Sequence, residues 1–147
     1  MSRFESAVYV TRKTTFCASH RYHNPDWSDE ENRRVFGACN NPYGHGHNYE
    51  VEVTVCGPID RETGMVLNLR ELDDLLEKEV VSRFDHRYIN KEVSEFETTI
   101  PTTENIALHI WDRLEPALRR RRSRLHRVRL YESADFYVEY LGEGTVK

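Results

Sequence analysis

Residues 45–56 read His-Gly-His-Asn-Tyr-Glu-Val-Glu-Val-Thr-Val-Cys, and they carry the clearest structural pattern in the chain. Polar and apolar residues alternate over most of this stretch, with the two-residue period of a β-strand that buries one face. That face carries, in order, His47, Tyr49, Val51, Val53 and Val55. We therefore expect a strand in which His45 and His47 point toward the core, where imidazole nitrogens need a partner.

A second strand is expected just upstream of this one. Residues Ala7–His20 are rich in Val, Thr, Tyr and Phe and contain neither Gly nor Pro, a composition typical of a long strand. By alternation, one face holds Phe16, Ala18 and His20. Residues 22–43, between the two strands, contain two prolines and a glycine, so we expect a loop with a short helical turn around Asp29–Val35.

Two amphipathic helices and two more strands follow. The first helix is capped by Asn68, and its apolar residues recur at helical spacing: Leu69, Leu72, Leu76 and Val80. The second begins at Thr102 or Thr103 and carries one apolar stripe: Ile106, Ile110, Trp111, Leu114 and Leu118. The strands are Leu125–Glu132 and Phe136–Leu141, and one face of the former holds Val128, Leu130 and Glu132.

The expected order of elements is therefore ββααββ. Strands grouped around two helices predict a four-stranded antiparallel sheet with two antiparallel helices packed on one face, an α+β fold. A chain of 147 residues has the usual size of one domain, so we expect a single domain over residues 1–147.

Composition narrows the class of protein. The formal net charge is -4, which does not suit a nucleic-acid binder, and no apolar stretch approaches the roughly 20 residues that cross a membrane. The opening residues lack the apolar core of a signal peptide. The three cysteines are an odd number at uneven spacing, which favours free thiols over a disulfide framework. We expect a cytoplasmic protein without nucleic-acid or membrane partners.

A basic run follows the second helix, made of Arg119, Arg120, Arg121, Arg122, Arg124, Arg127 and Arg129. Clustered guanidinium groups bind phosphate well, so nucleic acid is one reading. The negative net charge argues against it. We interpret the run as a solvated helix end followed by the polar face of a strand.

Three histidines predict a metal site. His45 and His47 leave one face of a strand, and His20 leaves the same face of its antiparallel neighbour, so the three side chains can converge. Three neutral imidazoles with an open fourth position are a common catalytic zinc arrangement. Two other readings stay open: core histidines bonded to the backbone, or a closed structural site in which Cys39 is the fourth ligand.

Six segments resemble the 6-pyruvoyltetrahydropterin synthase family, over about residues 10–143. They are Phe16–His20, Cys39–Tyr49, Gly64–Val66, Phe84–His86, Pro101–Asn105 and Tyr131–Glu132. The resemblance implies the tunnelling fold, in which the sheets of several subunits form a barrel. It also implies a homohexamer, a dimer of trimers, with sites between subunits.

The resemblance implies a role for each site residue. The zinc ion, Zn²⁺, would lie on His20, His45 and His47. Cys39 would abstract a proton, assisted by Asp85 and His86, because a carboxylate can orient a histidine ring. Glu132 would anchor the pterin ring, since a carboxylate accepts two parallel hydrogen bonds from the 2-amino group and N3–H. Near the ring would lie Thr102, Thr103 and Glu104.

The implied reaction is that of a zinc-dependent lyase. It eliminates triphosphate from 7,8-dihydroneopterin triphosphate, a pterin triphosphate, with internal redox rearrangement of the side chain. Some of the arginines of the basic run would then meet the triphosphate. Related 6-carboxytetrahydropterin synthases commonly have three residues between the cysteine and the His-Gly-His, whereas five separate Cys39 from His45, which favours the pyruvoyl branch. The alternatives are the carboxy branch and a metal-stabilised interaction module without catalysis.

Overall fold

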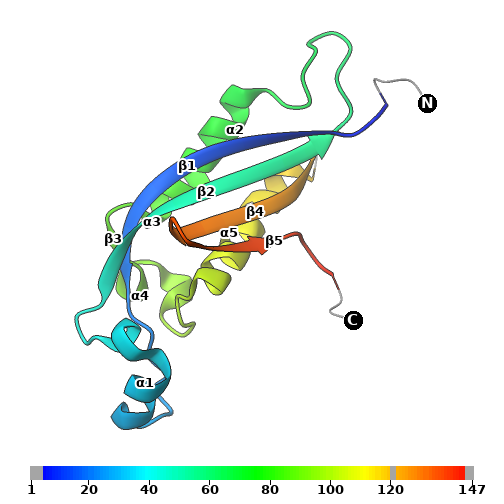
Figure 1. The fold of residues 1–147 in the computed structure, drawn as a ribbon. Coiled ribbons are helices and arrows are strands. Elements are labelled where there is room, and N and C mark those ends of the chain that lie inside the picture. Colours follow the sequence, from blue (N-terminus) through cyan, green and yellow to red (C-terminus); the bar gives the residue numbers. More distant parts are fainter. Residues whose placement is uncertain (1–4, 120–121, 145–147) are drawn as a thin grey trace.

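A five-stranded sheet forms the frame of the molecule, in a computed structural model that describes residues 5–119 and 122–144 (Figure 1). The strands lie in the order β3-β1-β2-β4-β5. Their bounds are Val8–His20 for β1, His45–Gly57 for β2, Arg87–Tyr88 for β3, Arg124–Ser133 for β4 and Phe136–Tyr140 for β5. The two long strands and the final pair therefore lie where the alternation predicts them.

The register of β1 and β2 fixes the end of the sheet that carries the histidines. The two strands pair antiparallel from Val8 opposite Gly57 to His20 opposite His45. Because side chains alternate across a strand, directly opposed residues leave the same face. His20, His45 and His47 therefore project from one face, at the end where β1 stops and β2 starts.

The predicted four-stranded, purely antiparallel sheet is wrong, because β3 adds a fifth strand. It pairs parallel to β1, with Arg87 opposite Ala18 and Tyr88 opposite Ser19, so the sheet is mixed. The order ββααββ also omits the short elements around β3. A strand of two residues is too short to show a period in the sequence, which is why alternation could not detect it.

Helices fill the connections between strands. The excursion after β1 contains α1, Asp29–Phe36, which Ser28 caps, and a single 3₁₀ turn, η1, Gly37–Asn40. After β2, α2 covers Leu69–Leu76 and continues through a π-helical turn, η2, Glu77–Val81, into α3, Ser82–Phe84. The cap of α2 is Asn68, as predicted, and its side chain accepts a hydrogen bond from the N–H of Arg70.

Three further helical elements lead from β3 to β4. They are α4, Ile89–Glu92, the 3₁₀ turn η3, Ser94–Phe96, and α5, Thr103–Leu118. Thr102 caps α5 by accepting a hydrogen bond from the N–H of Asn105, so this helix begins where the sequence predicts. The chain includes no helix, within the residues described, that is long and apolar enough to cross a membrane.

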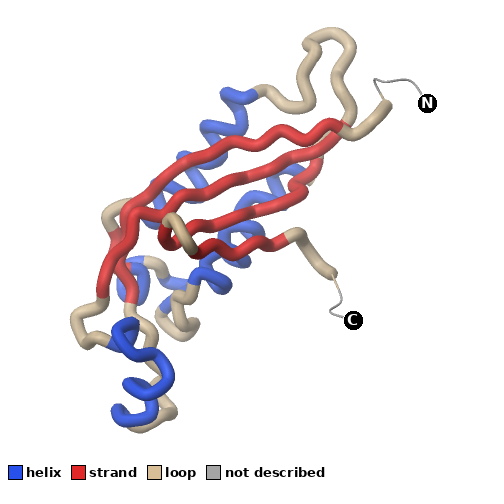
Figure 2. The backbone as a smooth tube through the Cα atoms, in the orientation of Figure 1, coloured by secondary structure: helices blue, strands red, loops and turns tan. Residues whose placement is uncertain are grey.

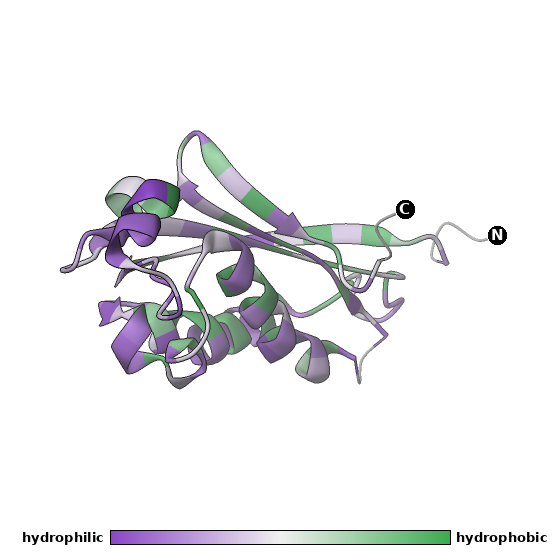
Figure 3. Ribbon diagram, turned by 90° about the horizontal axis from the view of Figure 1, so that it is seen from below, coloured by the Kyte–Doolittle hydropathy of each residue, from purple (hydrophilic) through white to green (hydrophobic). Residues whose placement is uncertain are grey.

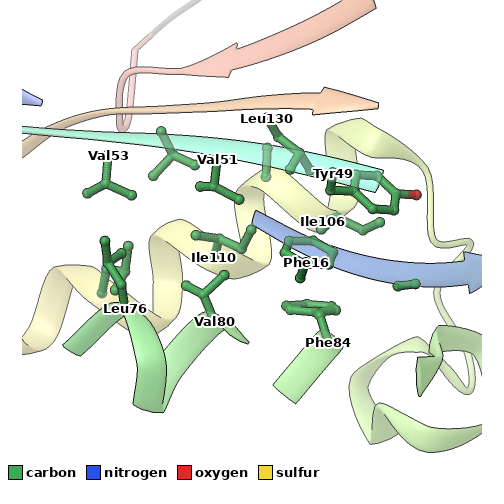
Figure 4. Packing of buried hydrophobic residues seen from close by; sticks show 14 of the residues in the cluster. Phe16, Tyr49, Val51, Val53, Leu76, Val80, Phe84, Ile106, Ile110 and Leu130 are labelled. Atoms are coloured by element: carbon green, nitrogen blue, oxygen red, sulfur yellow. The ribbon is translucent and has the colours of Figure 1, made fainter. Parts of the chain in front are cut away.

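The core lies between one face of the sheet and the helices α2 and α5 (Figure 3). Val53 of β2 faces Leu76 of α2, and Val51 faces Ile110 of α5, which is fully buried (Figure 4). At the site end, Phe16 stacks between Tyr49 and Phe84, with ring centroids 4.8 and 5.1 Å apart. The stack adjoins the histidines through Tyr49, whose ring centroid lies 6.1 Å from that of His20 and 5.6 Å from that of His47.

The opposite face of the sheet is charged. Glu52 is only 7% exposed there because long cations surround it: Lys13 at 3.4 Å, Arg127 at 3.4 Å and Arg129 at 3.5 Å. Glu139 binds Arg129 as well. The prediction that the basic run continues as a polar strand face is thus confirmed for β4, while Arg120 and Arg121 lie outside the described residues.

Candidate metal centre and its surroundings

Three histidine side chains converge where β1 ends and β2 begins. This is the end of the sheet near which α1 lies, as the backbone shows (Figure 1 and Figure 2). The ring centroids are 5.1 Å apart for His20 and His45, 5.0 Å for His20 and His47, and 4.9 Å for His45 and His47. One nitrogen of each ring lies within 4.8 Å of the other two. Ligands of a tetrahedral zinc ion, bound at about 2.0–2.1 Å, are about 3.3 Å apart, so small ring rotations would close this group around an ion.

Hydrogen bonding leaves one nitrogen of His20 for a ligand. The side chain is fully buried, and its Nδ1 lies 3.0 Å from the carbonyl oxygen of Pro101 and 3.0 Å from the hydroxyl of Tyr49. Its Nε2 is buried without a hydrogen-bond partner, as is Nε2 of His47. Buried polar atoms without a partner are rare, and a metal-binding histidine commonly donates its other N–H to a carbonyl. The residues therefore fit a metal ion.

Burial favours the neutral form of two of these imidazoles, because it lowers the pKa of His20 and of His47. Burial lowers the pKa of His20 to about 4, although the carboxylate of Glu132 opposes this. Burial also lowers the pKa of His47. Only the neutral ring can coordinate a metal, so no proton has to be displaced at neutral pH.

Cys39 lies near Glu132 and Tyr22 but is not one of the converging ligands. Of the described residues, the group of converging ligand atoms consists of the three histidines, so the closed site with Cys39 as fourth ligand is not formed. Cys39 belongs to η1, and its carbonyl oxygen accepts a hydrogen bond from the N–H of Tyr22 at 2.8 Å. Burial, and then the charge of Glu132, raise the pKa of its thiol.

Glu132 brings a carboxylate to the same place. It leaves β4 on the face of Val128 and Leu130, as predicted, and its Oε1 lies 3.4 Å from Nε2 of His47. Its Oε2 accepts hydrogen bonds from the hydroxyl of Thr103 and, at 3.3 Å, from that of Tyr22. A half-buried, hydrogen-bonded carboxylate beside three histidines is suited to hold a ligand that donates N–H groups.

Of the three predicted neighbours of the ring, one contacts Glu132. Thr103 is fully buried at the first position of α5 and donates to the carboxylate. Thr102 is occupied as the cap of the helix. Glu104 is exposed in the first turn.

The side chains of Asp85 and His86 contact each other, but they lie at the edge of the sheet, just before β3. Nδ1 of His86 lies 2.8 Å from Oδ2 of Asp85, while Oδ1 accepts a hydrogen bond from the N–H of Cys17 at 2.8 Å. Both contacts lower the pKa of Asp85, and the hydrogen bond from the backbone N–H of Cys17 has the larger effect. The side chain of His86 is 83% exposed. The pair therefore faces solvent in the single chain, and no hydrogen bond or ion pair described for residues 5–119 and 122–144 joins it to Cys39.

Two tyrosines of the site were missed in the sequence. Tyr49 was assigned only to the apolar core, yet its hydroxyl reaches His20. Tyr22 was assigned only to a loop, yet its hydroxyl reaches Glu132. Tyr49 lies two residues after His47 in β2, so the alternation of that strand was the signal that could have found it. Tyr22 lies beyond the end of β1, where the alternation of a strand no longer applies.

Fold and site together define an α+β protein with a three-histidine site, able to hold a metal ion, next to a carboxylate. Comparison with known proteins identifies the family to which the chain belongs. Residues 9–143 match the profile of the family described as 6-pyruvoyl tetrahydropterin synthase. The chain belongs to this family.

Relatives match over almost the whole chain. The 6-pyruvoyl tetrahydrobiopterin synthase of Drosophila melanogaster is 46% identical over 138 residues, which cover 94% of this chain and 82% of the fly protein. The human protein of that name is 46% identical over 134 residues, or 91% of each chain. The solved structure of Caenorhabditis elegans 6-pyruvoyl tetrahydropterin synthase superposes with a TM-score of 0.87 at 35% identity, covering 95% of this chain and 98% of that one.

Proposed function

We propose that this chain is a lyase that converts 7,8-dihydroneopterin triphosphate into 6-pyruvoyltetrahydropterin and inorganic triphosphate. The observation that carries the proposal is the convergence of His20, His45 and His47, two of them with an unpartnered buried Nε2, beside the carboxylate of Glu132. The names of the relatives agree with it. The product differs from the substrate by triphosphoric acid alone, so the reaction needs no external oxidant or reductant.

In this proposal the three histidines hold Zn²⁺. When bound, zinc would act as a Lewis acid toward the oxygens of the substrate side chain and so acidify the neighbouring C–H bonds. The Nδ1 contact of His20 with Pro101 fixes the ring so that Nε2 points toward the other histidines. The neutral state of the buried rings keeps this site ready for a cation at neutral pH.

Glu132 holds the pterin ring in the proposed complex. The 2-amino group and N3–H of the ring form a pair of adjacent donors, which matches the two oxygens of a carboxylate. Thr103 orients that carboxylate. Thr102 and Glu104, at the same helix end, complete the proposed surroundings of the ring.

Cys39 is the proposed base that takes a proton from a side-chain carbon. Its thiol pKa is raised in the single chain, so a nearby positive charge has to lower it before the thiolate can act. The Asp85–His86 pair can provide such a charge and relay the proton, but it faces solvent at the sheet edge. We therefore assign the pair to a site shared with a neighbouring subunit, within a homohexamer built as a dimer of trimers.

Two rival functions predict different products from the same substrate. The carboxy branch would consume one water and release triphosphate, acetaldehyde and a 6-carboxytetrahydropterin, whereas an interaction module would leave the substrate intact. The five residues between Cys39 and His45 favour the pyruvoyl branch. A single domain and a cytoplasmic location stay predictions.

Product analysis tests the proposal. Purified protein is loaded with zinc, incubated with 7,8-dihydroneopterin triphosphate and analysed by mass spectrometry, with chelator-stripped protein as control. The expected product is the pyruvoyl compound, formed by the loaded protein alone. A carboxy product would move the chain to the other branch, and intact substrate in both samples would refute catalysis.

A further inference from the structure

Tyr22 joins two parts of the site that are far apart in the sequence. Its hydroxyl donates to Oε2 of Glu132 on β4 at 3.3 Å. Its backbone holds η1, because its N–H donates to the carbonyl of Cys39 and its own carbonyl accepts from the side chain of Asn40, each at 2.8 Å. One residue thus connects the segment that carries the thiol to the carboxylate proposed to bind the ring.

The aromatic ring of Tyr22 packs against two other rings. Its centroid lies 4.8 Å from that of His20 and 5.9 Å from that of Phe36, which in turn stacks on Trp27 at 5.6 Å. A ring packed in this way loses little freedom when its hydroxyl makes a hydrogen bond. The phenol therefore reaches Glu132 from a preorganised position.

The hydrogen bonds of Glu132 are distributed unevenly between its two oxygens. Oε2 accepts from both Tyr22 and Thr103, whereas Oε1 lies 3.4 Å from Nε2 of His47. Two donors on one oxygen restrict rotation of the carboxylate about its last bond. They leave Oε1 directed toward the histidines with its lone pairs available to a ligand.

We propose that Tyr22 is a positioning residue of the ring site, which with Thr103 sets the orientation of the Glu132 carboxylate for a ligand bearing two adjacent N–H donors. The identity of that ligand as a pterin rests on the proposed function. Tyr22 does not touch the reacting carbons in this assignment. Its contribution is to binding, and it is passed on through Glu132.

The first test is the substitution Tyr22→Phe, which keeps the ring against His20 and Phe36 and removes only the hydroxyl. A hydrogen bond to a charged group contributes about tenfold or more to binding, so we expect KM for 7,8-dihydroneopterin triphosphate to rise roughly tenfold while kcat stays within about twofold. Tyr43→Phe is the matched control, because Tyr43 is 93% exposed. An unchanged or lower KM in Tyr22→Phe would overturn the inference.

A double-mutant cycle separates positioning from a general structural role. Binding of neopterin, followed by its fluorescence, is measured for wild type, Tyr22→Phe, Glu132→Gln and the double variant, together with zinc content. If Tyr22 acts through Glu132, the hydroxyl matters only when the carboxylate is present, so Tyr22→Phe should weaken binding in the wild type and not in Glu132→Gln. An equal loss in both backgrounds, or loss of zinc, would show a structural role instead.

The same measurements distinguish this inference from the proposed reaction. If the wild type fails to turn over but Tyr22→Phe still weakens neopterin binding, the reaction is refuted and the positioning role stands. If turnover is intact and both KM and neopterin binding are unchanged in Tyr22→Phe, the positioning role alone is refuted. If the wild type does not bind neopterin at all, the positioning role is refuted as well.

Discussion

At the scale of single residues, Cys39 is the side chain whose role is tested most simply. It is not part of the group of converging histidine nitrogens, so its removal should leave the metal in place. We expect Cys39→Ala to retain one zinc ion per chain, measured by atomic emission, and to lose activity by about 10²- to 10⁴-fold, the usual contribution of a general base.

Cys17 provides the matched control for that substitution. It is exposed on the other face of β1 and contacts Asp85 only through its backbone N–H, which Cys17→Ala preserves. This variant should keep both zinc and activity. Loss of zinc from Cys39→Ala would instead make Cys39 a ligand and exclude the proposed role as base.

The buried histidines also make a prediction for pH. The pKa of His20 is about 4 in the folded chain against an ordinary 6.5, so the unfolded state binds more protons between these values. Stability of the metal-free protein must therefore fall as pH falls through this window. Between pH 7 and pH 5 the wild type should lose about 2 kcal/mol more than His20→Asn, by urea unfolding in chelator. Equal losses in the two proteins would contradict the low pKa.

The residues of the metal site were predictable because they continue the two-residue alternation of the buried apolar residues in their strands. His20, His45 and His47 alternate in step with apolar neighbours, so two strands were enough to bring them together. Glu132 followed from the same argument on a third strand. Tyr22 did not, because its position depends on how the chain turns after β1 ends, and no local pattern encodes that turn.

At the scale of elements, the excursion between β1 and β2 depends on one buried amide. Asn32 of α1 is fully buried, and its side chain bonds the backbone of Asn24, Trp27 and Ser28. These bonds shape the segment that presents Cys39. Removing them leaves buried backbone groups without partners, at a cost of about 1–3 kcal/mol.

We therefore expect Asn32→Ala to lower the free energy of unfolding by about 1–3 kcal/mol and to speed amide hydrogen exchange mainly in α1 and η1. Glu30→Ala, an exposed change in the same helix, should stay within about 0.5 kcal/mol of the wild type. Zinc content should be unchanged in both variants. A uniform rise in exchange over the whole chain would contradict a local role.

The long elements were predicted, and so were the short helix α1 and the strand β5, whereas β3 and α4 were not. β1, β2, β4 and α5 each contain several periods of their pattern, so the sequence defines them to within one or two residues. β3 has two residues and α4 has four, about one period each, so neither is long enough for its pattern to repeat. These elements form because the frame around them is already in place, and tertiary contacts of this kind leave no local pattern.

At the scale of the whole molecule, the two edges of the sheet are formed by β3 and β5. Two of the proposed catalytic residues lie at one of these edges. Asp85 and His86 precede the edge strand β3, while β5 forms the other edge with Tyr137 and Phe136 about half exposed. Uncovered edges are suited to pairing with another copy. The proposed hexamer would use such contacts to bring the Asp85–His86 pair of one subunit to the Cys39 of the next.

Mixing two inactive variants tests that arrangement. If each site takes Cys39 from one subunit and His86 from another, random reassembly of Cys39→Ala with His86→Ala makes about a quarter of the sites intact. Activity should therefore return to about a quarter of the wild-type value after dissociation and reassociation. Each variant treated alone is the control, and a mixture as inactive as its parts would show that both residues act within one chain.

The central claim is that three histidines from two neighbouring strands hold one metal ion. Anomalous diffraction at the zinc absorption edge, from crystals grown with zinc, tests it most directly. The account predicts one peak per chain, about 2.0–2.1 Å from one nitrogen each of His20, His45 and His47, with Cys39 outside the coordination shell. A peak elsewhere, or none at these three rings, would contradict it.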